Sequence, residues 1–60
     1  MAGKFEIYSD TSGHYRFRLK AANGEIIATS QGYVSKEGAK SGIASVQTNA
    51  PTAAIEDLTK

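Results

Sequence analysis

The sequence contains no cysteine or tryptophan, a single histidine and a single proline. Small domains often gain stability from disulfides or a structural metal; this composition excludes the first and leaves too few ligands for the second. The chain is also short, since it has 60 residues, and a domain of that size buries only about 60% of the surface that its unfolded chain exposes. Association with a partner subunit is therefore the remaining route to a stable fold.

Large apolar side chains are scarce as well. Apolar residues make up 40% of the chain, but nine of them are alanine, and Leu, Ile, Val and Phe together number 11. Seven basic and six acidic residues leave a net charge of +1. Disorder requires high net charge as well as low hydrophobicity, so we expect a globular chain, and the few large apolar residues indicate that its core is thin. No apolar run approaches the roughly 20 residues of a membrane span or the roughly 7 of a signal-peptide core. We therefore expect a cytoplasmic protein without membrane contact.

In the first half of the chain, apolar and polar residues alternate in three short segments, as in β-strands. We place these strands at about 4–9, 14–21 and 25–30. The second strand, with the sequence YRFRLK, alternates most strictly, with aromatic and leucine side chains on one face and basic side chains on the other, as in a strand with one buried face. Asn23-Gly24 follows it and predicts a two-residue type I′ hairpin turn, since both residue types tolerate a positive φ.

The buried face fixes the pairing registers, because paired residues of antiparallel strands point to the same side. The two-residue turn pairs Leu19 with Ala28. The first hairpin then needs a loop with an odd number of residues, and Thr11-Ser12-Gly13 with Gly13 in the left-handed conformation meets this condition. The remaining predicted pairs are Ala22 with Glu25, Ala21 with Ile26, Phe17 with Ser30, Asp10 with His14, Ile7 with Phe17, Phe5 with Leu19, Glu6 with Arg18 and Tyr8 with Arg16.

After Ser35 the apolar period becomes helical, and we predict a helix over about 36–48. Its apolar stripe recurs at intervals of four, three and four residues, with Ser35 as N-cap and Glu37 in the first turn. Gly38 and Gly42 lie within it, where each costs up to about 1 kcal/mol relative to alanine, so the helix is expected to approach a sheet or another helix closely. The stripe consists of Ala39, Ile43, Val46 and Ala50.

A short final strand is predicted at about 53–58, which gives an α+β fold with the order β-β-β-α-β in a single domain over residues 1–60. One helix cannot fully cover a three-stranded sheet, and the last strand has no neighbour in its own chain. Two copies that share one sheet solve both problems, so we predict a homodimer. The candidate dimer contacts are Ala54, Ile55, Leu58 and Gly42.

Several segments together resemble the YegP-like family of small, uncharacterised bacterial proteins. These segments are Tyr15-Arg16-Phe17-Arg18-Leu19-Lys20-Ala21, Asn23-Gly24-Glu25-Ile26-Ile27 with Ser30, Gly32-Tyr33 with Ser35-Lys36, Gly38-Ala39-Lys40, Gly42-Ile43 with Ser45-Val46, and Asn49-Ala50-Pro51. The resemblance covers nearly the whole chain. It implies a strand-strand-strand-helix-strand unit that occurs as a tandem repeat or as a single copy forming a dimer, with the terminal strands exchanged into one sheet. It brings no biochemical activity, so the function stays unknown at this point.

The outer face of the second strand carries the only concentration of basic residues. A positive sheet face with an aromatic beside it is one way to bind a nucleic-acid backbone and stack a base. The alternative, which we favour here, is a solvated surface whose bases have cross-strand partners, Glu6 for Arg18 and the Tyr8 ring for Arg16. We therefore expect a small dimeric module with a binding or structural role and an unidentified macromolecular partner, and weak nucleic-acid binding through this face is the second candidate function. The candidate partner-binding residues are Arg16, Arg18, Lys20 and Tyr8.

The residues needed for catalysis are missing. His14 is the only histidine and falls at a predicted turn, and there is no cysteine to act as nucleophile or metal ligand. Glu56 and Asp57 are adjacent, but neighbours in a strand point to opposite faces and make a poor acid–base pair. The sequence thus predicts no catalytic residues, no metal site and no cofactor, and a protein that is not an enzyme.

Overall fold

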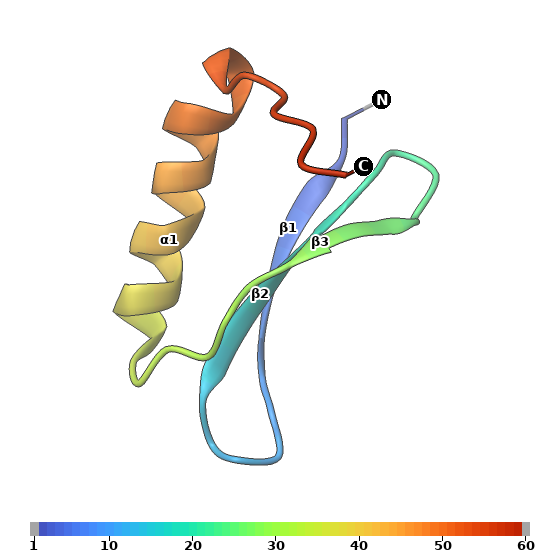
Figure 1. The fold of residues 1–60 in the computed structure, drawn as a ribbon. Helices are drawn as coiled ribbons and strands as arrows, with labels where there is room; N and C mark the ends of the chain where they lie inside the picture. Colours follow the sequence, from blue (N-terminus) through green and yellow to red (C-terminus); the bar gives the residue numbers. More distant parts are fainter. Residues whose placement is uncertain (1, 60) are drawn as a thin grey trace.

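The computed structural model describes residues 2–59, which form a three-stranded sheet and one helix on its inner face (Figure 1). The sheet is antiparallel with the strand order β1-β2-β3, and a short 3-10 turn, η1, follows the helix. The α+β class predicted from the sequence is confirmed. The elements are β1 (Lys4–Ser9), β2 (Tyr15–Lys20), β3 (Ile26–Thr29), α1 (Lys36–Asn49) and η1 (Ala50–Thr52).

The first hairpin has the predicted loop and register. The Asp10 N–H donates to the His14 carbonyl at 2.9 Å, the Gly13 N–H donates to the Asp10 carbonyl at 3.1 Å, and Gly13 has a φ of 83°. Glycine adopts this left-handed conformation without steric penalty, which is why it ends the three-residue loop. The pairs of Ile7 with Phe17 and of Phe5 with Leu19 follow from it.

The second hairpin does not have the predicted type I′ turn. Only Gly24, with a φ of 89°, is left-handed, whereas the Asn23 carboxamide oxygen accepts a 3.0 Å bond from the Glu25 N–H. The loop therefore has three residues, and the Ala21 N–H donates to the Glu25 carbonyl at 2.8 Å instead of Ala22 facing Glu25. The predicted pair of Ala21 with Ile26 is wrong as well.

A β-bulge restores the predicted register further along β3. Lys20 pairs with Ile26 and Leu19 with Ala28, so two residues of β3 are opposite one residue of β2. The Ser30 N–H donates to the Phe17 carbonyl at 2.9 Å, as the predicted pair requires. Ile26 consequently leaves the inner face expected for it and is half exposed.

Helix α1 begins at the predicted cap and lies close to the sheet at Gly42. The Ser35 hydroxyl accepts a 3.0 Å bond from the Gly38 N–H, which satisfies one of the unpaired amides of the first turn. A Cβ added at Gly42 would lie 2.9 Å from Tyr33 Cζ and 3.0 Å from Phe17 Cε2. Gly42 is therefore the close-approach position that the glycine pair predicted.

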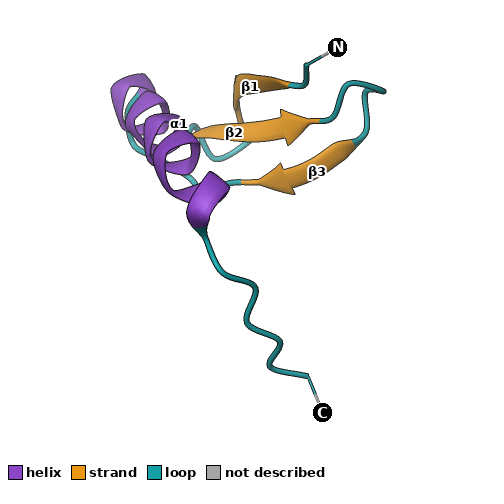
Figure 2. Ribbon diagram, turned by 90° about the horizontal axis from the view of Figure 1, so that it is seen from above, coloured by secondary structure: helices purple, strands orange, loops and turns teal. Residues whose placement is uncertain are grey.

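The core is small and lies between α1 and the first two strands. Phe17 and Ala39 are its buried members, and the Phe17 ring packs edge-on against Phe5 and is stacked with Tyr33, at centroid distances of 5.9 and 6.2 Å. The helix contacts β1 and β2 but not β3, and Figure 2 shows β3 to one side of it. Ala28 on the inner face is exposed as a result.

The predicted final strand is absent from the single chain. Residues 53–59 form no helix or strand, and in Figure 2 they run away from the helix and sheet. Ile55 is 97% exposed and Leu58 81%, because no strand among residues 2–59 pairs with this segment. No helix within residues 2–59 has the length and apolar character needed to cross a membrane.

Candidate binding face on the outer side of the sheet

The side of the sheet that faces away from α1 carries most of the strand charges, and we call it the outer face. The even-numbered residues of β1 lie opposite the even-numbered residues of β2, and strand geometry turns all of them to this side. The side chains stand close enough to interact across the two strands. The outer face consists of Lys4, Glu6, Tyr8, Arg16, Arg18 and Lys20.

Glu6 is the centre of an ion cluster. Its carboxylate accepts a 2.8 Å bond from Arg18 Nε and lies 3.3 Å from Lys4 Nζ and 3.4 Å from Lys20 Nζ. The Arg18 hydrogen bond, helped by the two lysines, lowers the pKa of Glu6 from its ordinary 4.5 to about 2. Three cations thus converge on one anionic group.

Tyr8 supports Arg18 and not Arg16. The Arg18 guanidinium carbon lies 4.8 Å from the centroid of the Tyr8 ring, within the range of a cation–π contact. The sequence-based expectation that Arg16 lies on this ring is therefore wrong. The reason is that a stronger partner, Asp10, binds Arg16.

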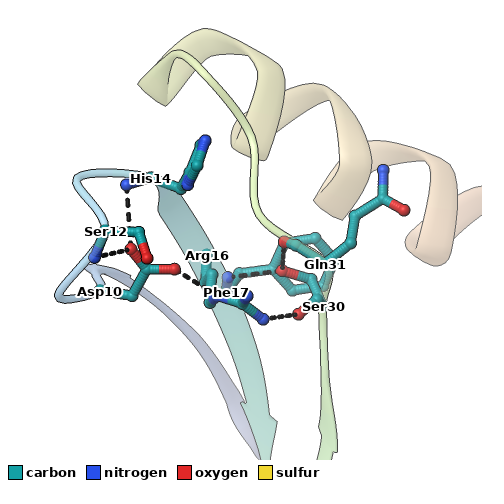
Figure 3. Close-up of polar contacts among 7 residues, drawn as sticks. All are labelled: Asp10, Ser12, His14, Arg16, Phe17, Ser30 and Gln31. Atoms are coloured by element: carbon teal, nitrogen blue, oxygen red, sulfur yellow. Dashed lines mark hydrogen bonds and ion pairs between the residues drawn. The ribbon is translucent and has the colours of Figure 1, made fainter.

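Asp10 links the first hairpin loop to Arg16. One carboxylate oxygen accepts bonds from the Ser12 and His14 N–H groups at 2.9 and 3.0 Å, and the other accepts from Arg16 Nε at 2.7 Å (Figure 3). The hydrogen bond from Arg16, with the backbone donor of His14, lowers the pKa of Asp10. The sequence analysis missed this role, although an aspartate directly before a Thr-Ser-Gly turn is a known signal for a loop cap.

Ser30 connects the other side of Arg16 to the core strand. Arg16 Nη1 donates to the Ser30 carbonyl at 3.1 Å, and the Ser30 hydroxyl accepts from the Phe17 N–H at 2.9 Å and donates to the Gln31 carbonyl at 2.7 Å (Figure 3). The hydroxyl takes the place of a backbone carbonyl where the chain leaves the strand, and the pairing resumes between Tyr15 and Tyr33. Arg16 is thus held by two different segments of the chain, whereas the ion-pair partner of both lysines among residues 2–59 is Glu6.

These pKa shifts predict a loss of stability in acid. A carboxylate whose pKa is lower in the folded than in the unfolded chain contributes stability above its unfolded pKa and loses it as the pH falls through its folded pKa. For Glu6 the loss spans about pH 5 to about pH 2, and Asp10 adds to it in the same direction. We expect the midpoint of thermal unfolding, followed by circular dichroism, to fall over this interval and Glu6→Gln to flatten the slope. A parent midpoint independent of pH over the interval contradicts the assignment.

Among the described residues, the other candidate residues form no ion pair with the outer face. His14 is exposed beside the first loop, and Glu56 and Asp57 are exposed on the C-terminal segment. Within residues 2–59 no three His, Asp or Glu side chains gather as a possible metal site, and the same residues enclose no pocket. Of the candidate dimer contacts, Ala54, Ile55 and Leu58 are exposed on the tail, whereas Gly42 lies against Tyr33 and Phe17 of its own chain.

Fold and surface together define a small α+β domain with a three-stranded meander, one covering helix and a charged outer face. The chain belongs to the family described as a domain of unknown function, DUF1508, whose model matches residues 10–57. It is 60% identical to a UPF0339 protein of Treponema denticola over 97% of this chain and the whole of that protein. It is 53% identical to the UPF0339 protein YegP of Escherichia coli over 85% of this chain and 46% of YegP. The YegP-like resemblance is confirmed.

A solved structure supports the fold. The solution structure of a protein from Haloferax volcanii aligns with a TM-score of 0.87 at 44% identity, covering 93% of this chain and 95% of that one. The resemblance had implied a bacterial family. Haloferax volcanii is an archaeon, so the fold is not confined to bacteria. The relatives are uncharacterised, and they assign no specific activity to the family.

Proposed function

We propose that the protein is a homodimeric binding module that exchanges its C-terminal segments and presents the outer face to a partner. The main support for a dimer is the apolar surface that a single chain leaves exposed. Phe17 and Ala39 are the buried apolar residues of the described chain, while Ile55 and Leu58 are almost fully exposed. Exposed apolar surface of this kind marks interaction sites.

The segment 53–59 has a suitable place on the sheet of a second copy. β3 is an edge strand that α1 does not contact, so its free N–H and C=O groups and its inner side are open to an added strand. In an extended segment Ile55 and Leu58 have opposite parity, so Ile55 can cover the inner face beside Ala28. YegP, of which this chain matches about half, has the length for two such units in one polypeptide.

We expect sedimentation equilibrium at micromolar concentration to give about twice the 6.4 kDa mass of the chain. Ile55→Asp places a charge in the shared apolar contact and should shift the protein to the mass of one chain, as should removal of residues 53–60. Thr52→Asp adds the same charge at an exposed position just before the segment and should leave the mass unchanged. A folded parent with the mass of one chain, or a stable dimer without residues 53–60, refutes the exchange.

We further propose that the module acts in the cytoplasm and by binding, without catalysis. Its outer-face carboxylate and arginines are engaged in ion pairs and hydrogen bonds, and general acid–base or nucleophilic chemistry needs a free nucleophile and base in contact. Surface side chains that face one way from a rigid sheet are suited to contact a second molecule. The outer face is therefore the surface on which a partner is sought.

A further inference from the structure

The positive charges of the outer face form a regular row along one strand. Arg16, Arg18 and Lys20 occupy alternate positions of β2, and alternate residues of a strand are about 7 Å apart. Successive phosphates of an extended single-stranded nucleic acid have a separation of the same order. Lys4 lies directly opposite Lys20 and adds a second cation at the end of the row.

The charge of this surface exceeds what its own acids neutralise. Lys4, Arg16, Arg18 and Lys20 carry four positive charges against the two of Glu6 and Asp10 with which they pair, so the net charge is +2. The Glu6 carboxylate lies within 3.4 Å of three of these cations, which shows that their flexible side chains can converge on one anion. The face thus combines a cluster of converging cations with an uncompensated positive charge.

Arg18 offers a flat surface for a base. Its guanidinium is held over the Tyr8 ring at 4.8 Å, and its side chain stays 34% exposed. Nucleobases stack on arginine planes and aromatic rings in single-stranded recognition. An arginine whose orientation is already fixed by Tyr8 and Glu6 loses less side-chain entropy when a base stacks on it.

From this arrangement we propose that the outer face binds single-stranded nucleic acid, with the backbone along β2 and a base on Arg18. The inference rests on the binding role proposed for this face and is independent of the dimer. A duplex fits less well, because α1 lies on the opposite side of the sheet and none of the other elements within residues 2–59 is a helix long enough to enter a groove. An acidic peptide could engage the cations but offers no base to stack.

The proposal is tested by fluorescence anisotropy with labelled oligo-dT and oligo-rU, a duplex, and an oligo-glutamate peptide. We expect micromolar binding of the single strands at low salt, weaker binding of the duplex and peptide, and a log–log salt slope of about −2, since three phosphate contacts contribute about −0.7 each. Lys4→Gln with Lys20→Gln should weaken binding at least about fivefold and reduce the slope. Lys36→Gln with Lys40→Gln removes the same charge from exposed positions of α1 and should have little effect.

Two further variants separate the charge from the stacking surface. Glu6→Gln removes the carboxylate that competes for the cations and should tighten single-strand binding severalfold at low salt. Tyr8→Ser should weaken binding with little change in the salt slope, because it removes the support of Arg18 and no charge. Circular dichroism verifies that each variant is folded.

The outcomes distinguish this inference from the proposed function. If the two lysine pairs weaken binding equally, binding follows overall charge, and the inference is refuted. If the peptide binds through the outer-face lysines and oligonucleotides do not, the partner is an acidic protein and the face keeps its proposed role. If no probe binds at low salt and micromolar concentration, the inference is refuted, whereas the proposed dimer is judged separately from the mass of the protein.

Discussion

Phe17→Ala is expected to abolish the cooperative unfolding of the protein. Phe17 is 7% exposed and its ring packs against Phe5 and Tyr33, so its removal leaves a cavity bounded by both aromatic rings and the helix at Gly42. Truncation of a buried phenylalanine costs about 3–5 kcal/mol. A core of this size rarely supplies more than about 3–5 kcal/mol in total, so the variant should lack a thermal transition in circular dichroism.

The matched control is Val34→Ala. Val34 is 88% exposed, so the loss of its side chain should move the midpoint by a few degrees at most. Phe17→Leu keeps most of the apolar volume and should stay folded with a clearly lower midpoint. A Phe17→Ala variant whose cooperative transition lies within a few degrees of the parent contradicts the register of β2 and the position of the core.

Alternation and turn chemistry predicted the first hairpin because both constrain the same register. The inner face requires a first loop with an odd number of residues, and Gly13 marks the end of a three-residue loop, so the two signals agree. The same register places Glu6 opposite Arg18 on the outer face. The second hairpin, in contrast, can form with either of two loop arrangements, and both use Gly24. A three-residue loop and a bulge with Ile27 as the extra residue replace the two-residue turn, and both arrangements keep Leu19 opposite Ala28.

The contacts of the candidate site could be predicted only in part. The sequence places the basic side chains on one face, but the choice of partner depends on competition between neighbours. Asp10 is fixed by the backbone of the first loop and binds Arg16 at 2.7 Å, which leaves the Tyr8 ring to Arg18. The role of Ser30 depends on the exact residue at which the chain leaves the sheet, and no periodicity encodes that position.

The C-terminal segment shows a different limit. Ile55 and Leu58 give residues 53–58 a weak strand pattern, yet a strand exists only when a neighbour supplies its hydrogen bonds. The described chain provides none, and the segment stays extended and exposed. The proposed exchange between two copies would supply this neighbour, and the mass of the protein in solution tests it.

Gly42→Ala is expected to destabilise the fold although it improves the helix. Alanine gains about 1 kcal/mol in helix propensity over glycine. The new Cβ, however, would lie 2.9 Å from Tyr33 Cζ and 3.0 Å from Phe17 Cε2, and such overpacking costs about 1–3 kcal/mol. The Phe17 ring has little room to move away, because it is buried and packs against both Phe5 and Tyr33.

Gly38→Ala is the matched control, one turn earlier in α1. A Cβ there meets the Ser35 hydroxyl at 3.3 Å and Tyr33 at 3.4 and 3.5 Å, distances that small shifts of the hydroxyl and the ring edge accommodate. We expect urea unfolding to show Gly38→Ala equal to or more stable than the parent. All variants are compared at one protein concentration, because the stability of the proposed dimer would depend on it. Gly42→Ala should be less stable than Gly38→Ala by about 2 kcal/mol. Equal stability of the two variants would show that α1 lies further from Phe17 than the structure places it.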